Sequence, residues 1–156
     1  MSKVVPSKKN ISFVILLIIT AVYILFIWWH STLTADESSV ESANVLEFLI
    51  NFLRSLGINA ELTDHIVRKS AHFCEFALLG CLTGWTFYSN NKRIIKNLLS
   101  IGFICLSTAV VDELVQIGSM GRSAEVPDVA LDFVGAVFGL LFFVIVIAII
   151  QLFKRR

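Results

Sequence analysis

Residues 11–29, ISFVILLIITAVYILFIWW, form an uninterrupted apolar run without a charged residue. An α-helix rises about 1.5 Å per residue, so roughly 20 apolar residues cross the hydrocarbon core of a bilayer. Residues 94–111 and 133–150 form two similar runs, in which Lys96 is the only charge. The chain is 56% hydrophobic and its mean hydropathy is +0.81, which is too apolar for a soluble domain of this size. The sequence therefore predicts an integral membrane protein.

A fourth apolar stretch, residues 67–88, is long enough to cross a bilayer but has charged residues at its start. The basic residues decide how it is interpreted, because cytoplasmic loops carry an excess of lysine and arginine. Four spans place all three basic clusters on one side of the membrane, so both termini are predicted to be cytoplasmic. These clusters are Lys3, Lys8 and Lys9, then Lys92, Arg93 and Lys96, then Lys154, Arg155 and Arg156.

These patterns predict an all-α fold, a four-transmembrane-helix bundle in a single domain over residues 1–156. Gly80 and Gly84, and likewise Gly135 and Gly139, form small-xxx-small pairs that let helices approach closely. The cysteines lie inside predicted spans and show neither a disulfide framework nor the spacing of a zinc site. The predicted spans are about 11–29, 67–88, 94–116 and 128–152.

The long connection between the first and second spans contains a predicted amphipathic helix. Ser38 and Glu41 have the form of a capping box, and apolar residues recur at helical spacing up to Gly57, a predicted C-cap. We expect an extracytoplasmic helix at about 40–57. It either lies flat in the outer headgroup layer or caps the bundle and covers the polar ends of the other helices.

Polar residues at the start of the second span share one helical face. His72 and Glu75 follow Arg68 by four and seven residues, which places them about 6 and 10 Å deeper along the helix axis. A charge at the centre of a lone span costs roughly 2.5–3.5 kcal/mol, so such residues face the bundle interior or a water-filled cavity. We expect this face to point toward the other helices, with Arg68 as a counter-cation.

The third and fourth spans bring further ionisable residues to the same depth on the outer side. Asp112 lies about 6 Å below Gln116 on one face, and Asp132 follows Asp128 by one turn. Arg122, in the short outer connection, is the second expected counter-cation. The sequence therefore predicts a small polar pocket that opens to the outside.

Three motifs resemble those of the VanZ-like family of small bacterial membrane proteins. They are RKSAHFCEFALLG at 68–80, DELVQ at 112–116 and GRSAEVPDVALDFVGAVFG at 121–139. The stretch HSTLTADESS is also similar to the Ser-rich segment that follows the first span of this family. The resemblance covers about residues 65–140. One departure is Asp132, where the family often has Asn.

The resemblance implies a location in the bacterial cytoplasmic membrane and a role at the cell envelope. The family takes its name from an accessory protein of glycopeptide-resistance clusters that is associated with resistance to teicoplanin. Lower teicoplanin susceptibility is therefore an implied property of this chain. The resemblance supplies no settled biochemical activity.

Binding is the first functional hypothesis. The outer pocket would bind a lipid headgroup, a cell-wall precursor or a lipoglycopeptide, and membrane lipids would surround the protein. Nucleic acid is not an expected partner, because the few basic residues are explained by membrane topology. No cofactor is expected. The candidate ligand-binding residues are Arg68, Lys69, Glu113, Gln116, Arg122, Asp128 and Asp132.

An enzyme acting on a lipid-linked envelope substrate is the alternative. His72 would act as a base oriented by Glu75, with Asp112 as a third candidate catalytic residue and Arg122 stabilising developing charge. Metal ligation by His72, Glu75 and Asp112 is chemically conceivable, but a single histidine among carboxylates leads us to assign no metal site. A third hypothesis is structural: the charges pair to lock the four helices together.

Overall fold

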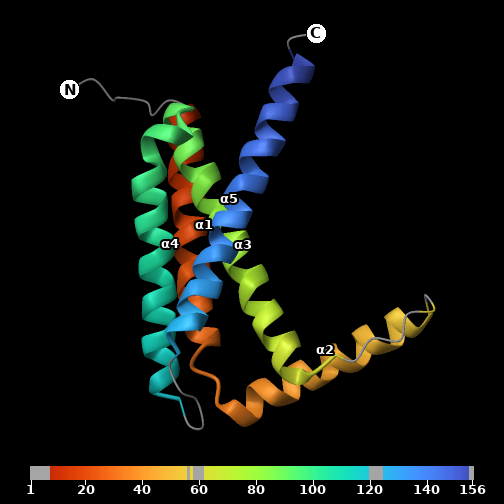
Figure 1. Cartoon of the computed structure of the whole chain (residues 1–156). Coiled ribbons are helices and arrows are strands. Elements are labelled where there is room, and N and C mark those ends of the chain that lie inside the picture. Colours follow the sequence, from red (N-terminus) through yellow and green to blue (C-terminus); the bar gives the residue numbers. More distant parts are fainter. Residues whose placement is uncertain (1–7, 56, 58–61, 120–124, 155–156) are drawn as a thin grey trace.

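The computed structural model describes residues 8–55, 57, 62–119 and 125–154, and these form five α-helices (Figure 1). The predicted all-α fold is confirmed. Helices α1, α3, α4 and α5 run together as a bundle, while α2 extends sideways from its lower end in Figure 1. The helices are α1 (Lys8–His30), α2 (Ala35–Ser55), α3 (Asp64–Asn91), α4 (Ile94–Ile117) and α5 (Val126–Lys154).

Three stretches within these helices are long and apolar enough to cross a membrane: Ile11–His30, Ile94–Ile117 and Val126–Lys154. Many of their large apolar side chains are exposed on the outside of the bundle. Contiguous exposed apolar surface is rare on soluble monomers, whereas the same surface is favourable against lipid. The chain is thus a multi-pass membrane protein.

Helix α3 is the central helix of the bundle and packs most extensively against α5. At their crossing, a Cβ atom added to Gly80 would overlap the backbone carbonyl of Ala136, and one added to Gly139 would overlap that of Ala77. The two backbones are therefore in direct contact, as the small-residue pairs predicted. The Cys81 thiol donates to the carbonyl oxygen of Gly139 at 3.0 Å across this crossing.

Helix α2 begins earlier than the sequence suggested, at Ala35. Thr34 and Glu37 form its capping box: the Glu37 Oε2 accepts from the Thr34 backbone N–H at 2.9 Å, and the Thr34 Oγ1 accepts from the Glu37 N–H at 3.3 Å. The prediction of an N-cap at Ser38 was wrong because that residue already lies within the helix. The box formed by Thr34 and Glu37 directly precedes the predicted one, and it is the box that starts the helix.

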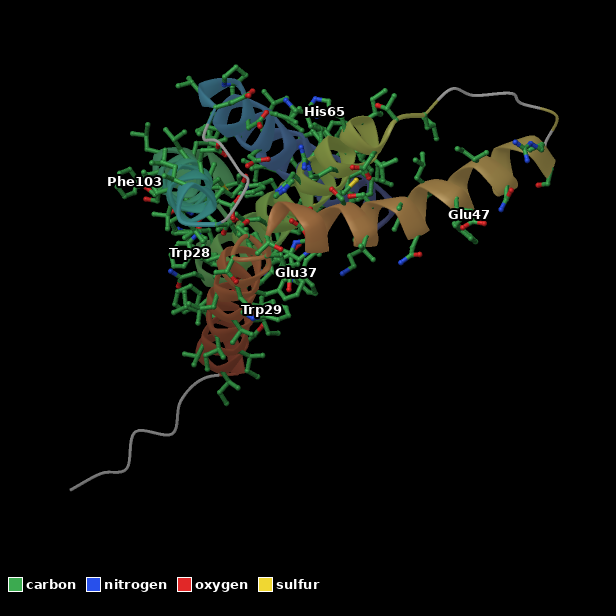
Figure 2. The ribbon with its side chains drawn as sticks, turned by 90° about the horizontal axis from the view of Figure 1, so that it is seen from below. Trp28, Trp29, Glu37, Glu47, His65 and Phe103 are labelled. Atoms are coloured by element: carbon green, nitrogen blue, oxygen red, sulfur yellow. The ribbon has the colours of Figure 1, made fainter. Side chains whose placement is uncertain are left out.

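Helix α2 packs against α3 and, among the described residues, against no other helix. The view in Figure 2 shows it leaving the bundle sideways, with Glu47 in the half farthest from α1. Ser38 and Ser42 are buried on the side of α2 near α3, while Val40 and Phe48 are exposed. The helix therefore extends beside the bundle instead of crossing its end.

Candidate functional site

Polar side chains from four helices meet at the end of the bundle from which α2 extends. Two hydrogen bonds hold α1 in place there. The Tyr23 hydroxyl donates to the backbone carbonyl of Glu75 at 3.1 Å, and the Trp28 indole N–H donates to that of Thr108 at 3.2 Å. We call the following residues the polar cluster: His30, Ser31, His72, Glu75, Asp112 and Asp132.

Asp112 is the most buried member of the cluster, with no exposed side-chain surface. Its Oδ1 accepts a hydrogen bond from the Ser31 hydroxyl at 2.5 Å, and its Oδ2 accepts one from the Gln116 amide at 2.9 Å. The hydrogen bond agrees with the prediction that Asp112 and Gln116 share one helical face. A buried carboxylate needs such donors, because an unpaired one carries a large desolvation penalty.

His72 lies between carboxylates from two helices. Its Nδ1 is 3.8 Å from the Glu75 Oε2 and 4.0 Å from the Asp112 Oδ2. The second Glu75 oxygen, Oε1, lies 3.0 Å from the Nδ1 of His30. The structure thus brings together the three candidate catalytic residues and adds a second imidazole beside them.

His30 and Ser31 were missed as site residues by sequence reasoning. They end α1 and start the following connection, and Ser31 is 1% exposed. A clue was present: the run HST follows the apolar span directly, so its polar groups had to lie at the same outer depth as His72. Their geometry could not be inferred without knowing which helix faces α1.

The remaining described candidates lie around the cluster. Lys69 donates from Nζ to the Oδ1 of Asp128 at 2.6 Å, joining the starts of α3 and α5. The Oε1 of Glu113, a buried residue, accepts the Glu125 backbone N–H at 2.6 Å. Arg122, an expected counter-cation, lies outside the described residues.

The residues that carry this cluster fall within a stretch, residues 13–148, that matches the model of the VanZ/LLP1 family. The chain belongs to the VanZ/LLP1 family. The resemblance predicted from the three motifs is therefore confirmed. No curated protein and no solved structure matches the chain.

In this VanZ/LLP1 protein an open groove of about 380 Å³ lies between α2 and α3 next to the polar cluster. His30 and His72 line it from the cluster side, and Arg68, the other expected counter-cation, lines it as well. Its remaining lining is mostly apolar. It includes the hydroxyls of Ser38 and Ser42, the apolar side chains of Val45 and Ile66, and the exposed thiol of Cys74.

Proposed function

We propose that this VanZ/LLP1 protein crosses the bacterial cytoplasmic membrane four times, with both termini in the cytoplasm and the polar cluster on the outer side. Two observations support this topology. The start of α1 and the end of α5 both point toward the end of the bundle opposite α2 in Figure 1. Helix α3, which contains the predicted second span, has 28 residues and is enclosed by α1, α4 and α5, so its polar face is sheltered from lipid.

We further propose that the α2–α3 groove and the polar cluster bind the polar end of an envelope amphiphile. The ligand classes are a lipid headgroup, a cell-wall precursor and a lipoglycopeptide. The observation that carries this proposal is the groove itself, since it places Arg68 and His72 beside apolar lining from Val45 and Ile66. A guanidinium suits phosphate and carboxylate groups, and the apolar lining suits an acyl chain.

The exposed apolar residues of α2 fit the same proposal. Val40 is 64% exposed and Phe48 69% exposed, although α2 has a buried polar side against α3. An amphipathic helix that extends sideways at the membrane surface buries such residues among headgroups and acyl chains. α2 would then form the membrane-facing wall of the groove, through which an amphiphile enters.

An enzyme acting on a lipid-linked substrate is the second candidate, favoured by the position of His72. An imidazole next to Glu75 and Asp112 has the partners that orient a general base. The same contacts also fit a clasp that fixes the helices, because breaking a buried charge network destabilises a protein even where the network adds little net stability.

Teicoplanin susceptibility of a sensitive host tests the binding proposal. The wild type would be expressed beside His72→Ala, Asp112→Asn, Arg68→Ala and Arg122→Ala, with membrane abundance measured through a tag. His65→Ala is the matched control, since this exposed histidine lies on the same helix outside the groove lining. We expect the wild type to reduce susceptibility and the site variants to lose the effect at equal abundance.

Each other outcome has its own meaning. Loss of the site variants from the membrane indicates a structural clasp. If the wild type does not change teicoplanin susceptibility, this chain does not share the resistance role from which the family takes its name. Full activity of His72→Gln excludes proton transfer by this residue, and with it the enzyme candidate in its present form.

A further inference from the structure

Three side chains from three helices converge within the polar cluster. His72 of α3, Asp112 of α4 and Asp132 of α5 each offer one ligand atom, and these atoms lie within 4.8 Å of one another. One imidazole nitrogen and two carboxylate oxygens are hard-to-intermediate ligands that suit divalent cations. The convergence is not a local effect of sequence, because no two of these residues share a helix.

Asp132 gives this convergence a second, independent basis. Its side chain is 2% exposed, yet it makes no hydrogen bond or ion pair with any residue that the structure describes. A carboxylate buried in this way costs several kcal/mol unless a partner compensates its charge. The groups nearest to it in the ligand set are a second carboxylate, which repels it, and His72. A bound cation supplies Asp132 with a partner that the described residues do not provide.

The neighbours of Asp112 are arranged as neighbours of a metal ligand usually are. Carboxylates that bind metals are themselves hydrogen-bonded, which fixes their orientation. Ser31 donates to one oxygen of Asp112 at 2.5 Å and Gln116 donates to the other at 2.9 Å. Each oxygen of a carboxylate has two lone pairs, so both donors leave Asp112 able to coordinate an ion.

We propose that His72, Asp112 and Asp132 bind a divalent transition-metal ion, with Zn²⁺ as the best-fitting probe. Nitrogen and oxygen ligands lie about 2.0–2.2 Å from Zn²⁺, so two of them are at most about 4.4 Å apart. Small side-chain rotations close the ligand set from its present spacing of up to 4.8 Å. Three protein ligands leave a coordination position for water or for an anionic group. The binding of the ion does not depend on the ligand proposed for the groove.

Metal binding is tested on the full-length protein, purified in mild detergent through a tag without histidines. The protein is stripped with a chelator and titrated with Zn²⁺ by calorimetry, and its metal content after desalting is measured by mass spectrometry. We expect about one ion per chain for the wild type. Asp132→Asn and His72→Ala should each weaken binding about tenfold or more, a loss typical of altered metal sites.

Two matched variants serve as controls for the Zn²⁺ titration. Asp128→Asn removes a carboxylate that lies on α5 one turn from Asp132 and pairs with Lys69. His65→Ala removes an imidazole from α3, the helix that carries His72. Both should bind Zn²⁺ as the wild type does. Mn²⁺ and Mg²⁺ titrations show whether the site prefers a transition metal.

The proposal is overturned if stripped wild-type protein binds no divalent ion, or if Asp132→Asn binds Zn²⁺ as tightly as the wild type. Should the site variants fail to fold, the wild type alone decides. Zn²⁺ must then raise its Tm and a chelator must reverse the rise; an unchanged Tm, combined with the absence of bound ion, rejects the site. Susceptibility to teicoplanin plays no part in this readout, so it remains separable from the proposed function.

Discussion

Helix α3 packs in two contrasting ways: tightly against α5 at their crossing, and loosely against α2, where a groove stays open. At the crossing, Gly80 and Gly139 bring backbone against backbone, and no space is left for a methyl group. At the groove, about 380 Å³ stays open beside the polar cluster. The difference teaches that one side of α3 fixes the positions of the helices, which leaves the other side free to hold polar groups and open volume.

The largest expected effect comes from adding one methyl group at the crossing. The Cβ of Gly139→Ala would overlap the backbone carbonyl of Ala77, so the two helices must separate. Overpacking of this kind typically costs about 1–3 kcal/mol, and we expect the upper end here because backbone cannot rotate away. Thermal unfolding in detergent and membrane abundance measure the loss.

Gly102→Ala is the control for that experiment. Nothing lies within 4 Å of a Cβ built on Gly102, and alanine is the better helix former by about 1 kcal/mol. Its Tm should therefore be unchanged or higher. If Gly139→Ala also leaves the Tm unchanged, the close α3–α5 contact does not determine the packing of the bundle.

The second effect lies on the groove side and concerns the hydrogen bonds to Asp112. Asp112→Ala leaves the Ser31 hydroxyl and the Gln116 amide without their acceptor, which should cost about 2 kcal/mol or more. Ser31→Ala should cost about 1 kcal/mol. The double variant should then be less destabilised than the sum of the two, because the second change removes a donor that has already lost its acceptor.

Strict additivity of Ser31→Ala and Asp112→Ala would contradict the contact between these side chains. Tm values measured in the same detergent provide the comparison. The tight crossing should be insensitive to both substitutions, so a change in the α3–α5 distance measured by paired spin labels would count against the separation of the two regions.

A smaller effect is expected for the ion pair that borders the site. Lys69 and Asp128 lie 2.6 Å apart but are each about one third exposed, so solvent screens their attraction. Lys69→Ala should lower the Tm only slightly, and the loss should shrink further in high salt. Tm measurements at low and high ionic strength decide this, and a large salt-independent loss would mean that the pair is shielded from water.

The smallest effect is a pH dependence at the start of α2. Hydrogen bonds from the Thr34 backbone and hydroxyl hold the pKa of Glu37 below its usual value. The ionised form is thus favoured in the folded helix, so the capping contribution is present above the ordinary glutamate pKa. It is lost as the pH falls through the lowered pKa. Hydrogen exchange in the first turn of α2 should accelerate over that acidic range.

Glu37→Gln should remove most of this pH dependence, while Glu47→Gln, an exposed change in the distant half of the same helix, should retain it. Equal pH profiles for the two variants would show that Glu37 does not cap α2. Helices α1, α4 and α5 should respond to neither substitution, since among the described residues α2 packs against α3 and against none of these three.

Periodicity and charge predicted much of the fold. Apolar runs placed the bundle helices, and the glycine pairs indicated where two of them touch, because small residues have few other roles in that pattern. Both glycine pairs lie on α3 and α5, whereas no comparable pattern in the sequence indicated which helices α1 and α4 contact. The N-cap of α2 was misplaced because two capping boxes, Thr34–Glu37 and Ser38–Glu41, directly follow one another in the sequence.

The sequence predicted the membrane depth and the helical face of the site residues, but not which residues they contact. His72, Glu75 and Asp112 were expected to meet, and they do. Ser31 was missed because a serine just beyond a span resembles an ordinary loop residue. Arg68 was expected among the carboxylates but lines the groove instead. Helical spacing gives the direction of a side chain from its own axis, whereas its contacts depend on rotations of neighbouring helices that spacing does not encode.

The thiol of Cys74 has a practical consequence for the study of this protein. It is exposed and lines the groove, whereas Cys105 is buried and Cys81 is half-buried beside α5. A maleimide dye should therefore attach at Cys74 first, at a position where its emission responds to local polarity. The native chain thus carries its own attachment point for a fluorescent reporter, and occupancy of the groove can be followed in real time without altering any residue of the polar cluster.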